Sequence, residues 1–360
     1  MLLGFYFLKI ECEVTIYYNK IAKVFFIYFH TFVYTIFIRR KTPLKVFKSI
    51  QNFSKIPNAV VTIGTFDGIH TGHKKIIARL REIASSINGE TVVVSFFPHP
   101  RLVLFPDDND LKLLNTEEEK TDLLAASGID NFNIIDFTKE FSRMSSLEFV
   151  RDILVNGIGA KKLVIGYDHH FGRNREGSLE NLRELAPLYG FEVEEIPAQD
   201  INNIAISSTK IRNALLLGNI ATANSFLGYN YSLSGNVVKG NQLGKTIGFP
   251  TANIAVKSRY KLIPANGVYA VKVKVADVLY DGMLNIGVRP TVNGQSLTIE
   301  ANIFAFDAII YDETITVYFV DRIRNEMKFS GLESLKEQLK KDKEYCTTML
   351  SKSKNEYAGI

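Results

Sequence analysis

The sequence contains the stretch Ala59-Val60-Val61-Thr62-Ile63-Gly64-Thr65-Phe66-Asp67-Gly68-Ile69-His70-Thr71-Gly72-His73. Its first five residues are β-branched at every position after Ala59, which is typical of a strand. The glycines from Gly64 to Gly72 indicate a turn, and the segment from Lys74 to about Ser86 is predicted to be a helix. A strand that passes through a glycine-rich turn into a helix indicates a parallel α/β sheet.

The alternation of strands and helices continues to about residue 228. A helix is expected at Glu117–Ser127, and further strands are expected at Thr91–Phe97, Asn133–Phe137, Lys162–Gly166 and Phe191–Ile196. This alternation predicts a parallel sheet that is covered by helices on both faces.

The pattern changes after Gly228. Strand-like segments separated by Gly, Pro, Asn and Asp occur at Leu233–Val238, Gly267–Val275, Val278–Ile286, Ser296–Phe306 and Thr314–Phe319. This pattern predicts a small antiparallel β-barrel. Gly331 then introduces leucines at helical spacing, which indicate a C-terminal packing helix. We therefore expect an α/β domain at 44–228 and an all-β domain at 229–350.

The charge of the chain does not favour nucleic acid as a partner. The formal net charge is +5, but residues 1–43 hold six Lys and Arg against two Glu, which leaves 37 basic and 36 acidic residues in the rest. The chain after residue 43 therefore carries nearly equal numbers of positive and negative charges and has no cluster of basic residues along one surface, which is not typical of nucleic-acid binding. The two cysteines, Cys12 and Cys346, indicate neither a disulfide framework nor a zinc site, so a cytoplasmic location is expected.

The first 43 residues differ from the rest in composition. Their uncharged run, Val24–Ile38, has 15 residues, whereas a membrane-spanning helix needs roughly 20. No small-residue cleavage site follows the run. We expect residues 1–43 to lie outside the functional enzyme and expect no membrane partner. A membrane anchor with Arg39–Lys41 on the cytoplasmic side stays the alternative.

The turn after Ile63 carries the first chemical pattern. Ligands of such sheets bind beyond the carboxyl ends of the strands, where glycines let the backbone approach phosphate and a helix N-terminus favours an anion. His70 and His73 lie three residues apart and can face one phosphoryl group. Two ordinary loop histidines and a zinc site are the alternatives, although no cysteine or HExxH pattern supports zinc.

A second pattern lies at Ile206–Arg212. Ser207, Ser208 and Thr209 precede a helix that carries Lys210 and Arg212 in its first turns. Helix capping alone explains the hydroxyl groups. Hydroxyl and basic groups at one helix start would equally form a clamp for a triphosphate, and the residues leave both interpretations open.

A third pattern lies at Gly235–Ile254. The spacing from Gly240 to Gly244-Lys245-Thr246 is one residue too short for a P-loop, and Pro250 stands where a P-loop needs a helix. A glycine-rich flap over phosphates fits better. Thr251 and Asn253, two apart on an extended segment, can present oxygen atoms to Mg²⁺.

Phosphoryl transfer to an alcohol also needs a carboxylate near the reacting hydroxyl. In the segment Thr298–Ile303, the alternation places Glu300 opposite the aliphatic face. From spacing alone, a solvated glutamate on a strand is the preferred interpretation.

Several segments, in order, resemble the bacterial bifunctional riboflavin kinase/FAD synthetase family. The adenylyltransferase half is similar at Gly64–His73, Phe96–Arg101, Gly166–Gly177 and Ile206–Arg212, and the kinase half at Gly248–Asn253, Gly267–Ala270, Asn285–Thr291 and Glu300. The resemblance covers roughly residues 44–350. It implies a Rossmann-like nucleotidyltransferase domain followed by a riboflavin kinase barrel. It also implies that ATP first phosphorylates riboflavin to FMN and then adenylylates FMN to FAD, with release of pyrophosphate.

The resemblance also implies roles for individual residues. His70 and His73 would contact the ATP phosphates, and Glu300 would be the general base of the kinase. Asp168, Arg175 and Arg289 would lie on the flavin side. Thr251 and Asn253 would hold Mg²⁺, and the nucleotide would be bound by Gly64, Thr65, Phe66, Gly72, Ser207, Ser208, Thr209, Arg212, Gly240, Gly244, Gly248 and Asn253.

The implied partners are riboflavin, FMN and ATP, and a homo-oligomer is compatible with the sequence. The alternative function is a catalytically inactive flavin- or nucleotide-binding regulatory protein of the same fold. The presence of His70, His73, Thr251, Asn253 and Glu300 argues against that alternative.

Overall fold

The computed structural model describes residues 43–107, 111–166, 169–197, 206–240, 243–291 and 294–352. The described residues from Leu44 onward form one compact unit. The expectations for the N-terminal extension and for Asp168 lie outside the described residues.

The first part of this unit is a six-stranded parallel sheet with the strand order β1-β4-β3-β2-β5-β6. Its strands are β1 (Lys45–Phe47), β2 (Ala59–Ile63), β3 (Thr91–Phe97), β4 (Asn131–Asp136), β5 (Ala160–Gly166) and β6 (Glu192–Ile196). Its helical elements are η1 (Ile50–Asn52), α2 (Thr71–Ser86), α3 (Pro100–Leu104), α4 (Glu117–Ala126), η2 (Phe141–Arg143), α5 (Ser146–Glu148), η3 (Phe149–Ile158), η4 (Arg173–Arg175), α6 (Leu179–Tyr189), α8 (Ser208–Leu216) and α9 (Ile220–Leu227). The predicted parallel α/β sheet is confirmed.

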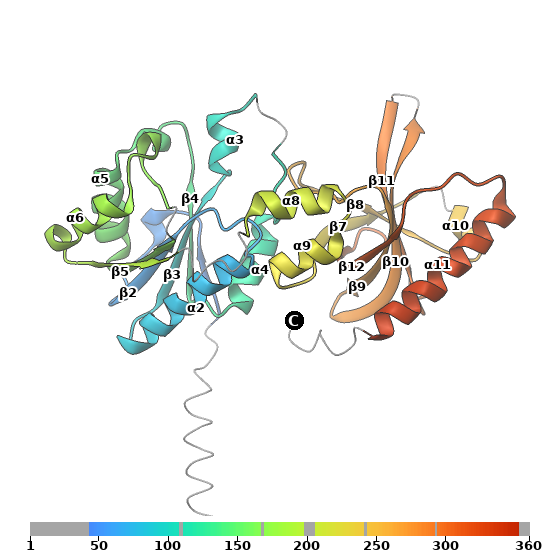
Figure 1. Ribbon diagram of the computed structural model, residues 1–360, viewed down its shortest axis with the longest axis horizontal. Coiled ribbons are helices and arrows are strands. Elements are labelled where there is room, and N and C mark those ends of the chain that lie inside the picture. Colours follow the sequence, from blue (N-terminus) through green and yellow to red (C-terminus); the bar gives the residue numbers. More distant parts are fainter. Residues whose placement is uncertain are drawn as a thin grey trace, which may run out of the picture. The chain divides into compact units, whose positions relative to one another are not determined.

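Both faces of the sheet are covered, as Figure 1 shows. Val60 and Val93 pack with α2 and α4 on one face, whereas Val61 and Val94 pack with η3 and α6 on the other. Neighbouring strand residues point to opposite faces. For this reason β2 is apolar nearly throughout, and all five of its residues are buried.

The strand order reverses next to β2. The chain runs from β2 to β3 and β4 on one side and returns to β5 and β6 on the other. In sheets of this kind the ligand site lies at such a reversal, beyond the carboxyl ends of the two strands. The segments that follow β2 and β5 are therefore the structural candidates for the first site.

Helix α2 begins at Thr71, three residues earlier than the sequence predicted. His70 is the N-cap residue, and its Nδ1 accepts a hydrogen bond from the backbone N–H of His73 at 3.4 Å. The cap satisfies a free N–H of the first turn. The two histidines therefore belong to the helix terminus itself.

The second part is a closed antiparallel barrel with the order β10-β11-β8-β7-β12-β9. Its strands are β7 (Ser232–Val238), β8 (Ala252–Ala255), β9 (Gly267–Val275), β10 (Val278–Thr291), β11 (Gly294–Ile303) and β12 (Thr314–Arg324), and its helices are α10 (Leu243–Thr246) and α11 (Leu332–Lys352). The predicted barrel and C-terminal helix are confirmed. Strand β10 runs five residues beyond the predicted end at Ile286, because its pairing with β11 continues to Thr291 and Gly294.

Two apolar clusters stabilise the barrel. The interior cluster includes Leu233, Val271 and Ile299, and residues of α8 and α9 pack against it. The expected domain boundary at Gly228 stays a prediction, since both helices before it contact the barrel core. A second cluster joins the outer surface to α11 through Met283 and Cys346. Among the residues described, no helix is both long and apolar enough to cross a membrane.

Candidate active sites

His70 and His73 lie together at the first turn of α2. Their rings stack with centroids 3.7 Å apart and an interplanar angle of 18°. The ring of Phe66 lies 5.0 Å from that of His73. The pKa of His73 lies well below its ordinary value of 6.5, mainly because the side chain is buried. The nearby His70 and, after it, Lys120 lower this pKa further. His73 is therefore neutral near pH 7 and can act at a phosphate as a hydrogen-bonding group.

Asp67 connects the turn after β2 with two other segments. The side chain of this residue is buried, and its Oδ1 accepts from the backbone N–H groups of Leu114 at 2.9 Å and Asn115 at 3.3 Å. Its Oδ2 accepts from Nη2 of Arg212 at 2.6 Å. The backbone carbonyl of Asp67 accepts from the hydroxyl of Ser208 at 2.9 Å. Sequence reasoning missed Asp67, although a carboxylate inside a glycine-rich turn was a signal for it.

The Asp67 contacts bring the start of α8 to the turn after β2. Ser207 is the N-cap residue of α8, and its hydroxyl accepts from the N–H of Lys210 at 3.3 Å. Capping thus explains Ser207. Ser208 and Arg212 instead contact Asp67, while Thr209 is exposed on the first turn. Arg212, Ser208 and the two histidines consequently lie at one end of the sheet.

His99 and Arg175 also follow strands that end at this edge. His99 is the N-cap residue of α3, and its Nδ1 accepts from the N–H of Arg101 at 3.2 Å. Burial lowers the pKa of His99 to about 4. Arg175 is exposed in η4, after β5, with a positive φ of 62°. Sequence reasoning quoted His99 within a motif and assigned it no role.

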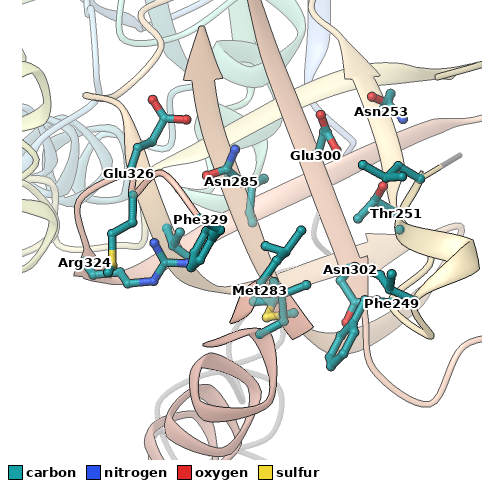
Figure 2. Close-up of a pocket in the computed structure, with 18 of the residues that line it drawn as sticks. Phe249, Thr251, Asn253, Met283, Asn285, Glu300, Asn302, Arg324, Glu326 and Phe329 are labelled. Atoms are coloured by element: carbon teal, nitrogen blue, oxygen red, sulfur yellow. The ribbon is translucent and has the colours of Figure 1, made fainter. Parts of the chain in front are cut away.

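The second site is a pocket on the outer surface of the barrel. Strand pairing places Asn285 of β10, Glu300 of β11 and Asn253 of β8 in one row, with Glu300 in the middle. Figure 2 shows these polar side chains toward one end of the pocket and Met283 and Phe249 toward the other. The pocket therefore has a polar end, formed by this row, and an apolar end, at Met283 and Phe249.

Glu300 lies on the side of β11 that faces away from the barrel interior. Its neighbours Ile299 and Ala301 are buried in the interior cluster, as the alternation predicted. The side chain of Glu300 is 14% exposed, and its Oε1 lies 2.5 Å from Nη2 of Arg289. The structure thus brings together the expected base and a residue that was expected on the flavin side.

The glycine-rich segment lies against the same row. A Cβ atom at Gly240 would lie 2.2 Å from Nδ2 of Asn253, and one at Gly244 would lie 2.2 Å from the carbonyl oxygen of Phe249. A side chain at Gly240 would displace the side chain of Asn253, whereas one at Gly244 would need a shift of the backbone at Phe249. Gly248 has a φ of +84°, which favours glycine. The segment after residue 242 forms the short helix α10, which sequence reasoning described only as a flap.

The polar end of the pocket offers oxygen ligands. Thr251, Asn253 and Glu300 all line the pocket. Together they provide a hydroxyl group, an amide oxygen and a carboxylate. Among the described residues, no group of three or more His, Cys, Asp and Glu could hold a metal. Mg²⁺ typically binds a few protein oxygens together with substrate phosphates. The residues present therefore fit Mg²⁺ that arrives with a nucleotide.

The pocket is closed on one side by residues that sequence reasoning missed. They are Arg324 at the end of β12 and, after it, Glu326, Met327 and Phe329. A Cβ atom at Gly287 would lie 2.0 Å from Oε1 of Glu326. Arg324 is fixed by an ion pair of 2.6 Å with Asp342 of α11. Because these contacts join distant parts of the chain, no local motif indicated them.

Comparisons with known proteins match two successive parts of the chain to two families. Residues 53–210 match the family described as FAD synthetase, and residues 227–350 match riboflavin kinase. A bifunctional riboflavin kinase/FMN adenylyltransferase of Buchnera aphidicola is 38% identical over 83% of this chain and 96% of its own length. The protein of the same description from Escherichia coli K12 is 37% identical over the same shares. A crystal structure described as a macrolide-efflux protein from Streptococcus pneumoniae is 33% identical, with a TM-score of 0.77, over 84% of this chain and 98% of its own.

Proposed function

The chain belongs to the bifunctional riboflavin kinase/FMN adenylyltransferase family, and on this premise we propose that its two reactions are divided between the two sites described above. It is an enzyme that makes FMN and FAD. Adenylyl transfer is assigned to the end of the parallel sheet, and phosphoryl transfer to the pocket on the barrel.

In the kinase reaction, Glu300 accepts the proton of the ribityl hydroxyl group while that oxygen attacks the γ-phosphorus of ATP and ADP leaves. The position of Glu300 between Asn285 and Asn253 supports this role. Thr251 and Asn253 would hold Mg²⁺, which neutralises phosphate charge when it is bound. The apolar end of the pocket fits the flat ring system of riboflavin.

In the adenylyltransferase reaction, a phosphate oxygen of FMN attacks the α-phosphorus of ATP and pyrophosphate leaves. His70 and His73 would donate hydrogen bonds to the phosphates at the N-terminus of α2, where free N–H groups and the helix dipole favour an anion. Arg212 and Ser208, which Asp67 holds at the same edge, would bind the nucleotide. Arg175 and Asp168 are assigned to the flavin side.

The observation that carries the kinase proposal is the row in which Glu300 stands between two asparagines on the strands beside it. Its test uses two variants of the full chain. Glu300→Gln should lower FMN formation by roughly 10²–10⁴, while supplied FMN is still converted to FAD.

The double variant His70→Ala/His73→Ala should form FMN normally and accumulate it. By analogy with the loss of one preorganised donor, each substitution should cost on the order of 10²–10³ in the rate of FAD formation. Chromatography of riboflavin, FMN and FAD separates the products. If the histidine variant also lost riboflavin phosphorylation while folded, the division between the sites would be wrong.

A further inference from the structure

Lys120 of α4 reaches the turn that connects β2 with α2. Its Nζ donates to the carbonyl oxygen of Thr65 at 2.6 Å and to the hydroxyl of Ser95 at 3.4 Å. The Ser95 hydroxyl also donates to the Thr65 carbonyl, at 3.2 Å. Thr65 lies in the turn, whereas Ser95 lies on the neighbouring strand β3. One ammonium group therefore joins the turn to the adjacent strand.

The helix that carries Lys120 is held from its other side. Thr116 and Glu119 form a capping box at the start of α4. The carboxylate of Glu119 pairs at 2.5 Å with Lys261, whose side chain is fully buried. Because its first turn is anchored in this way, α4 can serve as a fixed support for the ammonium group of Lys120.

The charge of Lys120 also acts on the histidine site. It is one of the groups that lower the pKa of His73, after burial and His70. It lowers the pKa of His99 as well. Burial lowers the pKa of Lys120 itself, and the carboxylates of Asp67 and Glu117 oppose that effect. Lys120 is thus coupled to the turn both by geometry and by charge.

We propose that Lys120 is a positioning residue of the adenylyl-transfer reaction: its ammonium group fixes the turn at Thr65 against β3 and thereby sets where His70 and His73 meet the nucleotide phosphates. The inference rests on the proposed function of the two histidines. A misplacement of about 1 Å in such a site costs on the order of 10² in rate. The effect should appear in kcat, since Lys120 acts through the turn.

The test compares Lys120→Met with Lys162→Met in the full chain. Lys162 lies in β5 and pairs with Glu192 and Glu194 of β6, so its removal also deletes an ion-paired lysine of the α/β part, away from the turn after β2. Lys120→Met should lower kcat for FAD formation by about 10- to 100-fold and leave riboflavin phosphorylation unchanged. Lys162→Met should leave both rates unchanged. Lys120→Arg, which keeps the charge and N–H donors, should recover part of the loss.

A spectroscopic measurement tests whether the charge of Lys120 acts on His73 in the folded protein. The charged or titratable groups that act on His73 are His70, in the turn before α2, and Lys120, on α4. The His73 ring signals, followed by NMR against pH, should report a higher pKa in Lys120→Met. They should keep the original pKa in Lys162→Met.

The inference would be overturned if a folded Lys120→Met variant formed FAD at the full rate while the His70→Ala/His73→Ala variant did not form it. If the histidine variant formed FAD normally, the proposed function of that site would fail instead. Should Lys120→Met not fold, Lys120→Gln, which keeps an N–H donor without the charge, is measured in its place. Failure of both variants to fold would also overturn the inference, because Lys120 would then determine folding rather than the place of the turn.

Discussion

Nη2 of Arg289 lies 2.5 Å from Oε1 of Glu300, across the pair of strands β10 and β11. Arg289 is 45% exposed, whereas the carboxylate it holds is only 14% exposed. A guanidinium group binds carboxylate oxygens in a fixed plane. Arg289 can thus orient Glu300 while the second carboxylate oxygen remains available to a substrate hydroxyl group.

Arg289→Met is expected to lower the rate of FMN formation about tenfold, a smaller loss than that caused by removal of the base itself. Methionine keeps the apolar stem and removes the cation. Arg289→Lys should fall between methionine and the native residue, because lysine keeps the charge and loses the planar fork. The measurement is the initial rate of riboflavin phosphorylation. An undiminished rate in Arg289→Met would show that Glu300 needs no orienting partner.

Thr251→Val is expected to raise the Mg²⁺ concentration that gives half-maximal FMN formation. Valine replaces the hydroxyl group with a methyl group of similar size and so removes one oxygen ligand. Thr314→Val is the matched control, because Thr314 lies on β12 and donates to Asn236 outside the pocket. A Mg²⁺ titration of the kinase rate compares the two variants. Identical curves for both would contradict the role of Thr251.

Gly240→Ala is expected to weaken FMN formation without altering FAD formation from supplied FMN. The added Cβ would lie 2.2 Å from Nδ2 of Asn253, so the side chain of Asn253 must move. Gly331→Ala adds the same methyl group where no heavy atom lies within 4 Å and should leave the rate unchanged. The KM for ATP and the kinase rate are measured for both variants. Equal values would indicate that Asn253 does not contact the nucleotide.

His99→Asn is expected to reduce the loss of stability at acid pH. The folded-state pKa of His99 is about 4, below the 6.5 of an unperturbed histidine. As pH falls below 6.5, the unfolded state takes up a proton that the native state does not, so stability decreases until about pH 4. The decrease is roughly 2.5 kcal/mol at pH 4.5.

Asparagine offers a side-chain oxygen that can accept the capping hydrogen bond from the N–H of Arg101 in place of Nδ1 of His99, and it does not titrate. Urea unfolding followed by circular dichroism at pH 7 and pH 4.5 measures the difference between the two proteins. The same acid-dependent loss in both would indicate that His99 takes up its proton in the folded state.

A shortened chain that begins at Leu44 is expected to fold and to make both FMN and FAD. The described residues from Leu44 onward form one compact unit, and the chemical patterns all begin at Gly64 or later. The yield of soluble protein and the rates of both reactions are compared with those of the full chain. A loss of either activity would show that the first 43 residues contribute to the catalytic body.

Several features of the fold could be predicted from local patterns. Val60–Ile63 identified a strand, because β-branched residues favour extended backbone and an apolar run favours burial on both faces. The alternation at Ile299–Ala301 likewise placed Glu300 outside the barrel interior. The start of α2 was predicted three residues late, because a histidine side chain supplies the cap in place of the more common Ser, Thr, Asp or Asn.

The sequence by itself determined the order of the elements and the parallel sheet followed by a barrel, and it supplied the candidate site residues of each half. Each of these depends on a contiguous segment, because the secondary-structure propensity and the spacing of apolar residues are properties of the local sequence. Only the tertiary structure decided which side chains meet across the chain. Arg212 pairs with Asp67, which lies 145 positions away in the sequence, and Lys120 binds Thr65, which lies 55 positions away. Such contacts depend on strand order and on the packing of helices against the sheet, which a local pattern does not contain.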